Sequence, residues 1–335
     1  MTANPVALSI ERGCDRSPLL EVTIGAAFDR MAATQGDREA LVVRHQGIRW
    51  SWRELARRVD AVASGLLALG LERGDRVGIW APNCAEWVVL QFATAKAGLV
   101  LVNINPAYRL HELEYALNTA GCRAIISAER LRTSKYLEML QSLAPEMATS
   151  EPGALKSARL PALQFVIRMG TERTPGMLGY EDVLARGGER PDSRMLDGIT
   201  ATLDCHDAIN IQFTSGTTGN PKGATLTHHN VVNNGRFVAQ AMRFTERDSL
   251  CIPVPLYHCF GMVLSVLACV STGAQMVFPG EIFDPGATLG AVAAERCTAC
   301  RRCSSPNSTI RISAASTCRR CVPASWPAHR ARSRR

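Results

Sequence analysis

Apolar, strand-like segments alternate with amphipathic, helix-like segments through the first half of the chain, and this alternation constrains the fold more than any other feature. Ser51–Gly70 places apolar residues at three- and four-residue steps, as on one face of a helix. Ser51 and Glu54 at its start form a capping-box pattern. Buried strands are expected at Val77–Trp80, Leu99–Ile104, Arg123–Ser127 and Ile209–Phe213. Strands separated by helices predict a doubly wound α/β fold, with helices on both faces of a largely parallel sheet.

A stretch rich in Gly, Pro and charged residues at 171–200 interrupts the alternation, and we place a domain boundary there. Strand and helix patterns resume after it, so the sequence predicts doubly wound mixed or parallel sheets in two stacked subdomains. The expected divisions are an N-terminal arm (1–20), a first α/β subdomain (21–170), an irregular connection (171–200), a second α/β subdomain (201–296) and a tail (297–335).

The charge of the chain is concentrated at one end. The tail 297–335 contains nine Arg and no acidic residue, so the other 296 residues together carry −1 of the net +8. A nearly neutral body gives no electrostatic footprint for a nucleic acid, and none is expected as a partner. Five of the 12 Cys also lie in the tail, and the other seven have no paired spacing, which indicates a reducing compartment. Without a secretory signal or a membrane-spanning apolar run, a cytoplasmic location is expected.

A polar loop is the clearest candidate site. Residues 214–223 read Thr-Ser-Gly-Thr-Thr-Gly-Asn-Pro-Lys-Gly, directly after an expected strand and before an expected helix at about residues 227–242. Glycines let the backbone approach an anion, successive N–H groups form a nest, and hydroxyls and a Lys ammonium add donors. A Gly/Ser/Thr surface linker is the alternative interpretation. The candidate residues for binding phosphate are Thr214, Ser215, Gly216, Thr217, Thr218, Gly219 and Lys222.

This loop resembles the signature of the adenylate-forming superfamily, the AMP-binding enzymes. Residues 95–98 with 103–106 are similar to its second signature, and residues 255–261 to its fourth. Residues 148–153 and 157–161 resemble bacterial medium-chain and fatty acyl-CoA synthetases most. The resemblance covers roughly residues 20–296 and identifies the chain as an incomplete N-terminal domain of an AMP-forming ligase.

The resemblance implies a two-step reaction, an AMP-forming acid–CoA ligase activity. A carboxylate attacks the α-phosphate of ATP to give an acyl-adenylate, and the thiol of coenzyme A then displaces AMP. ATP, Mg²⁺ and coenzyme A are the implied cofactors, and a fatty acid is the implied substrate. The sequence leaves open the chain length of the acid, the acyl acceptor and the oligomeric state.

The resemblance also assigns an acid-binding pocket to the fourth signature. The candidate pocket residues are Tyr257, His258, Phe260 and Gly261. From the residues alone, His258 could equally be a core histidine bonded to a backbone carbonyl. His228 and His229 are expected at a helix start, with His228 able to help order the loop, and adjacent His residues cannot share a helical face in a joint metal site.

The tail differs from the rest of the chain, and the family's later motifs for adenine, Mg²⁺, ribose and the C-terminal Lys are absent. Its Arg, Cys, Ser, Ala and Pro bias is typical of out-of-frame translation of a GC-rich gene. We therefore expect a truncated chain that does not turn over, with a disordered tail. Two alternatives remain: a non-catalytic nucleotide-binding remnant, and a zinc and nucleic-acid-binding protein. The second rests on the zinc-like spacing of Cys300, Cys303, Cys318 and Cys321.

Overall fold

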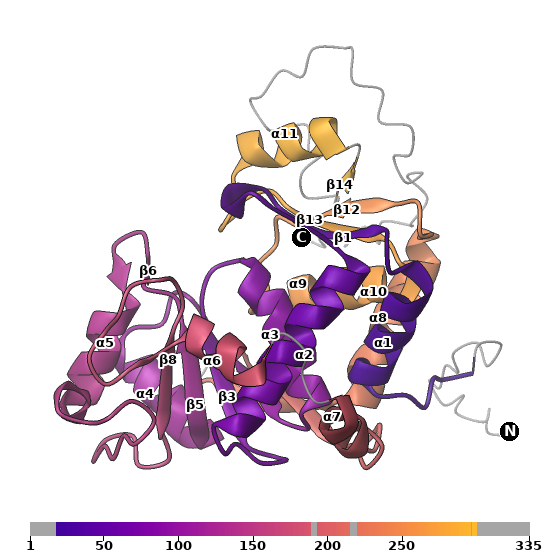
Figure 1. Ribbon diagram of the computed structural model, residues 1–335. Helices are drawn as coiled ribbons and strands as arrows, with labels where there is room; N and C mark the ends of the chain where they lie inside the picture. Colours follow the sequence, from indigo (N-terminus) through magenta and orange to yellow (C-terminus); the bar gives the residue numbers. More distant parts are fainter. Residues whose placement is uncertain (1–17, 189–192, 215–219, 296, 300–335) are drawn as a thin grey trace, which may run out of the picture.

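Two β-sheets alternate with three layers of helices in the computed structural model, which describes residues 18–188, 193–214, 220–295 and 297–299 (Figure 1). One apolar core fills the space between the two sheets, a second lies on the far face of the larger sheet, and a small third lies on the far face of the smaller sheet. The predicted α/β class with stacked sheets is therefore confirmed. The greater part of the tail, residues 300–335, lies outside the described residues.

The larger sheet has seven strands in the order β11-β10-β4-β3-β5-β8-β9. All neighbouring strands pair in parallel except β10 and β11, which pair antiparallel. The strands are β3 (Arg76–Trp80), β4 (Val100–Asn103), β5 (Cys122–Ser127), β8 (Phe165–Arg168), β9 (Leu178–Gly179), β10 (Ala208–Thr214) and β11 (Lys222–Thr227).

The outer face of this sheet is covered by α4 (Leu110–Ala120) and α5 (Tyr136–Leu143), with the short turn η2 (Pro145–Ala148) and the small hairpin of β6 (Arg130–Leu131) and β7 (Ser134–Lys135). The rings of Trp80 and Tyr136 stack with their centroids 4.0 Å apart. Trp80 Nε1 donates to Asn105 O at 3.1 Å, and Tyr136 Oη donates to Pro106 O at 2.8 Å. These buried aromatic residues thus satisfy their polar groups on the turn that follows β4.

Most remaining helices pack between the sheets or against the helices there. They are α1 (Ile24–Gln35), α2 (Trp52–Ala68), α3 (Ala85–Lys96), α6 (Tyr180–Gly187), α7 (Ser193–Thr200), α8 (His228–Met242), and the continuous run of α9 (Cys259–Gly261), η3 (Met262–Leu267) and α10 (Ala268–Thr272). Ser51 caps α2, as predicted, by accepting a hydrogen bond from the backbone N–H of Glu54. No helix in the described ranges has the length and apolar content that a membrane crossing requires.

Lys96 ends α3 and is buried between two carboxylates. Its ammonium lies 2.7 Å from Asp29 Oδ1 and 2.5 Å from Asp60 Oδ1. Burial opposes its charge, but the two carboxylates outweigh burial and raise the pKa of Lys96. The contacts of Lys96 join α1, α2 and α3.

The smaller sheet has the strand order β14-β12-β13-β1-β2. Its strands are β1 (Glu39–Val43), β2 (Ile48–Ser51), which the short turn η1 (Arg44–Gln46) joins to β1, then β12 (Ser249–Cys251), β13 (Gln275–Phe278) and β14 (Thr298–Ala299). Helix α11 (Pro285–Glu295) covers its outer face.

The strand pairing does not follow the predicted division of the chain into 21–170 and 201–296. Strands β1 and β2 come from the first of these segments, but they belong to the smaller sheet, where β1 pairs with β13. Strands β10 and β11 come from the second segment, but they extend the seven-stranded sheet. The predicted boundary was wrong in this respect. Backbone hydrogen bonds between distant segments decide which sheet a strand joins, and a local residue pattern carries no information about them.

One local prediction also needs correction. Residues 222–227 form a strand, so the polar loop joins two strands and the helix starts only at His228. Asn83 does not cap α3; the cap position is Cys84, which makes no side-chain capping bond. The Asn83 amide donates to Val254 O and accepts from Leu256 N, so it joins α3 to the chain entering α9.

Candidate functional site

The described ends of the polar loop meet at the carboxyl edge of the seven-stranded sheet. Thr214 ends β10 and Lys222 begins β11, and the two residues are direct partners in the antiparallel pair. Thr214 Oγ1 donates to Lys222 O at 3.4 Å. The other predicted phosphate-binding residues, namely Ser215, Gly216, Thr217, Thr218 and Gly219, lie outside the described residues. Ligands of open α/β sheets bind at this edge of the strands, which is where the predicted loop starts and ends.

The mouth of the β10–β11 hairpin, formed by Thr214 and Lys222, has donors suited to an anion. Thr214 and Lys222 are both exposed. Within the described part of the chain, no carboxylate forms an ion pair with the Lys222 ammonium. A hydroxyl and an uncompensated ammonium fit phosphate oxygens and do not fit a bare cation. Neither side chain offers the carboxylate oxygens that magnesium prefers.

The predicted acid pocket begins at the start of α9. His258 is exposed and caps this helix, because its Nδ1 accepts the backbone N–H of Phe260 at 3.1 Å. The alternative of a buried core histidine is thereby ruled out. With Nδ1 as acceptor, the neutral imidazole carries its proton on Nε2, which remains able to donate. Tyr257 and Phe260 are half-buried.

Gly261 is buried where the chain folds tightly against itself. A Cβ atom at this position would lie 2.4 Å from the carbonyl oxygen of Pro255. Only glycine fits so close an approach without moving the backbone. The geometry of the predicted pocket segment thus depends on this residue.

Asn103, at the end of β4, connects the pocket segment to the strand that carries the loop. Its amide donates to Tyr257 O at 3.2 Å, and its Oδ1 accepts from Asn210 Nδ2 at 2.9 Å. Gln212, two residues before Thr214, has its amide 3.9 Å from the sulfur of Met262. The structure therefore brings the predicted pocket segment and the described ends of the predicted loop to one region of the sheet edge.

The sequence reasoning gave Asn103 and Gln212 no role. Asn103 belongs to the segment that resembles the second family signature, and it is a polar residue inside a buried strand. Buried amides require partners, so this position could have been recognised as a connecting residue.

His228 lies at the other end of β11 from Lys222, away from the described ends of the loop. It is buried, and its Nδ1 accepts the backbone N–H of Ile24 at 3.0 Å. Burial lowers the pKa of His228 to about 4. The side chain is therefore neutral at pH 7 and fixes the N-terminal segment to the start of α8.

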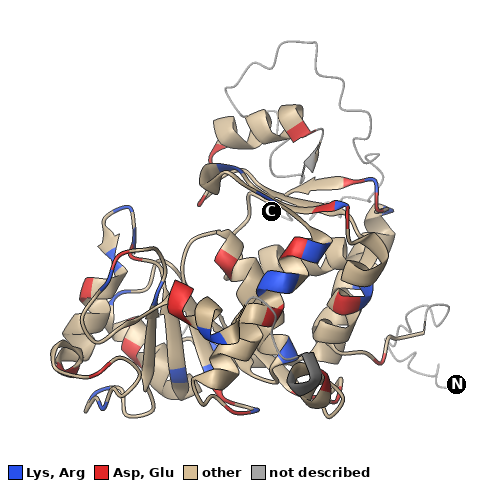
Figure 2. Ribbon diagram, viewed as in Figure 1, with Lys and Arg blue, Asp and Glu red and all other residues tan. Residues whose placement is uncertain are grey.

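Charged residues of both signs are intermixed over the described body, with no large region of a single sign in this view (Figure 2). This distribution matches the nearly neutral composition outside the tail. Lys222 is one of several cationic side chains without an ion-pair partner among the described residues, and what distinguishes it is its position beside Thr214 at the sheet edge.

Comparison with known proteins shows the family of the chain. A family model described as AMP-binding enzyme matches residues 28–303. The human protein named "Medium-chain acyl-CoA ligase ACSF2, mitochondrial" is 42% identical over 303 residues, which cover 89% of this chain and 49% of the relative. The protein of the same name from Danio rerio is 43% identical and covers 87% of this chain and 48% of the relative. The chain thus spans about half the length of these curated relatives.

A solved structure shares the fold. The long-chain-fatty-acid-CoA ligase FadD1 from Archaeoglobus fulgidus superposes with a TM-score of 0.70 over 87% of this chain and 54% of that protein. Its sequence identity of 21% makes this a likeness of fold.

Proposed function

Since this chain belongs to the family of AMP-binding enzymes, we propose that it serves the reaction of an AMP-forming acid–CoA ligase. A fatty acid would attack the α-phosphate of ATP to give an acyl-adenylate and pyrophosphate, and coenzyme A would then take the acyl group and release AMP. The names of its curated relatives support a medium-chain fatty acid as the substrate.

The observation that carries the proposal is the hairpin mouth. Thr214 and Lys222 face each other across β10 and β11, exposed and at the carboxyl edge of the sheet. We propose that they bind the β- and γ-phosphates of ATP together with residues 215–219. Their contribution is electrostatic and positional: they hold the leaving pyrophosphate and disperse its charge, and they make no covalent bond.

The acid would bind beside this hairpin at residues 257–261. The Nε2–H of His258 is a suitable donor to a carboxylate oxygen, since its Nδ1 is already engaged by the helix start. The half-buried rings of Tyr257 and Phe260 would form apolar walls for the first part of the acyl chain. Asn103 keeps this segment at a fixed position relative to β10.

We further propose that the protein acts in the cytoplasm. The cysteines that the structure describes form no disulfide, which is the usual state of thiols in a reducing compartment.

The experiment is a binding titration of the 335-residue chain with MgATP, followed by calorimetry, with inorganic pyrophosphate as competitor. Saturable binding that pyrophosphate displaces is the expected result, because both ligands would occupy the hairpin mouth. Binding of MgATP that excess pyrophosphate leaves unchanged would contradict the phosphate role of Thr214 and Lys222.

Acid-dependent exchange of labelled pyrophosphate into ATP measures the first chemical step. The 335 residues lack the family's adenine motif and C-terminal Lys, so we expect exchange at the level of the blank. Exchange that rises with added fatty acid would show instead that this chain completes the adenylation by itself.

A further inference from the structure

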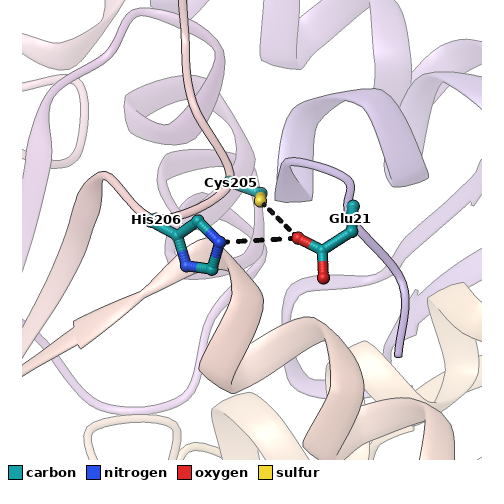
Figure 3. Close-up of side chains that lie close together, drawn as sticks. All are labelled: Glu21, Cys205 and His206. Carbon is teal, nitrogen blue, oxygen red and sulfur yellow. Dashed lines mark hydrogen bonds and ion pairs between the residues drawn. The ribbon is translucent and has the colours of Figure 1, made fainter. Parts of the chain in front are cut away.

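Three side chains with metal-binding atoms converge away from the sheet edge described above (Figure 3). Glu21 comes from the segment before α1, and Cys205 and His206 come from the turn before β10. Their ligand atoms all lie within 4.8 Å of one another. Glu21 Oε2 is 3.1 Å from Cys205 Sγ and 3.5 Å from His206 Nε2. A sulfur, an imidazole nitrogen and a carboxylate oxygen thus surround one point.

The backbone that carries Glu21 is fixed on both sides. Leu20 N donates to Asn233 Oδ1 at 2.7 Å, and Asn233 Nδ2 donates back to Leu20 O at 3.0 Å. Three residues after Glu21, Ile24 N donates to His228 Nδ1. All these bonds join the N-terminal segment to α8, so the position of the carboxylate is set by the fold even though its side chain is exposed.

The turn that carries Cys205 and His206 is fixed in the same way. Cys205 O accepts from His229 N at 2.7 Å, and His206 N donates to Asp204 Oδ1 at 2.7 Å. Asp207 forms an ion pair with Arg73 at 2.7 Å. Ligand atoms on two fixed segments need little reorganisation to bind an ion.

His229 completes the surroundings of the carboxylate. Its Nε2 lies 3.2 Å from Oε1 of Glu21, on the oxygen that faces neither Cys205 nor His206. In metal sites, a neighbouring residue commonly orients a ligand by bonding the ligand's other polar atom, which does not face the metal. Loss of that neighbour typically weakens metal binding 10- to 100-fold. His229 is therefore the candidate positioning residue, although its Nε2 makes no hydrogen bond of good geometry in this structure.

We propose that Glu21, Cys205 and His206 form a zinc site, with His229 orienting Glu21 and with one coordination position left for water or another ligand. Zinc accepts sulfur, nitrogen and oxygen ligands in tetrahedral geometry. Its usual bond lengths place neighbouring ligand atoms about 3.3–3.7 Å apart. The 3.5 Å between Glu21 Oε2 and His206 Nε2 falls within that spacing. The 3.1 Å between Glu21 Oε2 and Cys205 Sγ is that of a hydrogen bond, so these two atoms would move a few tenths of an ångström apart around the metal.

The alternative is a metal-free cluster in which the thiol donates to the carboxylate. That hydrogen bond to Glu21 raises the pKa of Cys205 to about 11. Zinc binds the thiolate, so the thiol proton must leave when the metal binds. A bound zinc would join the segment before α1 to the turn before β10, at an exposed point of the surface.

The test measures zinc and cobalt binding by the 335-residue chain and by three single variants, Cys205→Ser, His206→Ala and Glu21→Gln. Competition with a chromophoric chelator gives zinc stoichiometry and affinity, and the thiolate-to-cobalt absorption band reports a sulfur ligand. Each variant is expected to bind one zinc fewer per chain, and Cys205→Ser to show a weaker band by the contribution of one thiolate. The Cys residues of the tail are the same in every variant, so the difference isolates this site.

Cys259→Ser is the matched control, because Cys259 also adjoins a His, with Sγ 3.6 Å from His258 Nδ1, but no Glu or second His is among its described partners. It should bind as much zinc as the unaltered chain. Wild-type stoichiometry and an unchanged cobalt band in Cys205→Ser would overturn the proposal, provided that melting curves in EDTA show both proteins folded.

The role of His229 is tested by two further variants. His229→Ala should weaken zinc binding about tenfold, and His229→Gln should restore most of the affinity because its amide can donate to Glu21. A role in folding alone would shift the melting temperature in EDTA without a difference in zinc affinity between the two variants. That result would remove His229 from the proposed site.

Discussion

The two ends of the β10–β11 hairpin use their polar groups in opposite ways. At the mouth, Thr214 and Lys222 are exposed, and one side-chain bond of 3.4 Å links them. At the base, the first residues of α8 bond back to the chain entering β10: His228 N donates to Asp207 O, and His229 N donates to Cys205 O. His228 also accepts from the segment before α1.

Within this one hairpin, the base therefore contributes to stability and the mouth is available to bind a ligand. The base has most of its donors and acceptors engaged, so it holds the hairpin in position. The mouth keeps a hydroxyl and an ammonium available, at little cost in stability since water solvates both groups. Changes at the base should therefore affect unfolding, and changes at the mouth should affect ligands.

The largest effect is expected from His228→Ala. The change leaves the buried N–H of Ile24 without an acceptor and opens a cavity, which should lower the free energy of unfolding by about 4 kcal/mol. Urea unfolding at pH 8 in EDTA measures it. A loss below about 0.5 kcal/mol, within the range of ordinary surface changes, would mean that the base is not the rigid end of the hairpin.

The next effect is a pH dependence from the same side chain. Its pKa is about 4 in the folded protein, against an ordinary value of 6.5. Between these values the unfolded chain binds a proton that the folded protein excludes, so stability falls as pH is lowered from 6.5 to 4. The total loss should be about 3 kcal/mol, with no change above pH 7 from this residue.

The measurement is urea unfolding at a series of pH values, again in EDTA. His228→Asn is the control, because its amide oxygen can still accept from Ile24 but does not titrate. Its stability should fall less between pH 6.5 and 4 than that of the unaltered chain. Equal slopes for the two proteins would contradict a neutral, buried His228.

At the mouth, Lys222→Ala should weaken MgATP binding about tenfold, or ~1.4 kcal/mol, by removing one charge-assisted contact. The free energy of unfolding should hardly change, since the side chain is exposed. Calorimetry with MgATP tests the first point. Lys156→Ala, which removes another exposed lysine, should bind MgATP normally. Equal weakening in both variants would indicate a general charge effect.

The smallest effect is expected from Thr214→Ala, the counterpart of His228→Ala at the opposite end. It removes a single long hydrogen bond at an exposed position, so unfolding should change by less than about 0.5 kcal/mol. Urea unfolding under the same conditions checks this value. A loss comparable with that of His228→Ala would remove the contrast between the two ends.

The local parts of this fold were accessible from sequence, and the long-range parts were not. The helix after Ser51 and the strand Val77–Trp80 carry their signals within their own residues, and the structure has both. Residues 222–227 were not recognised as a strand, because Gly and Thr residues at a sheet edge have no apolar alternation. Their strand character comes from pairing with β10.

The candidate sites show the same limit. The loop 214–223 is contiguous, so its composition and its position after an expected strand predicted a phosphate site, and that prediction still awaits the binding experiments. The cluster around Glu21 could not be found in this way, because Glu21 and Cys205 are 184 positions apart in the chain. Reasoning about adjacent residues considered His228 with His229 and excluded a metal. The fold brings residues that are distant in the sequence into contact, and such residues form this cluster.

The position of β1 has a consequence for synthesis on the ribosome. This strand pairs with β13, and Glu39 and Gln275 are separated by 236 positions. At about 5–20 residues per second, residues 39–43 wait roughly 10–50 seconds before their partner strand emerges. During that time an apolar strand has an open edge, which other chains can reach. A nascent polypeptide of this kind would depend on chaperone protection until its last strands are made.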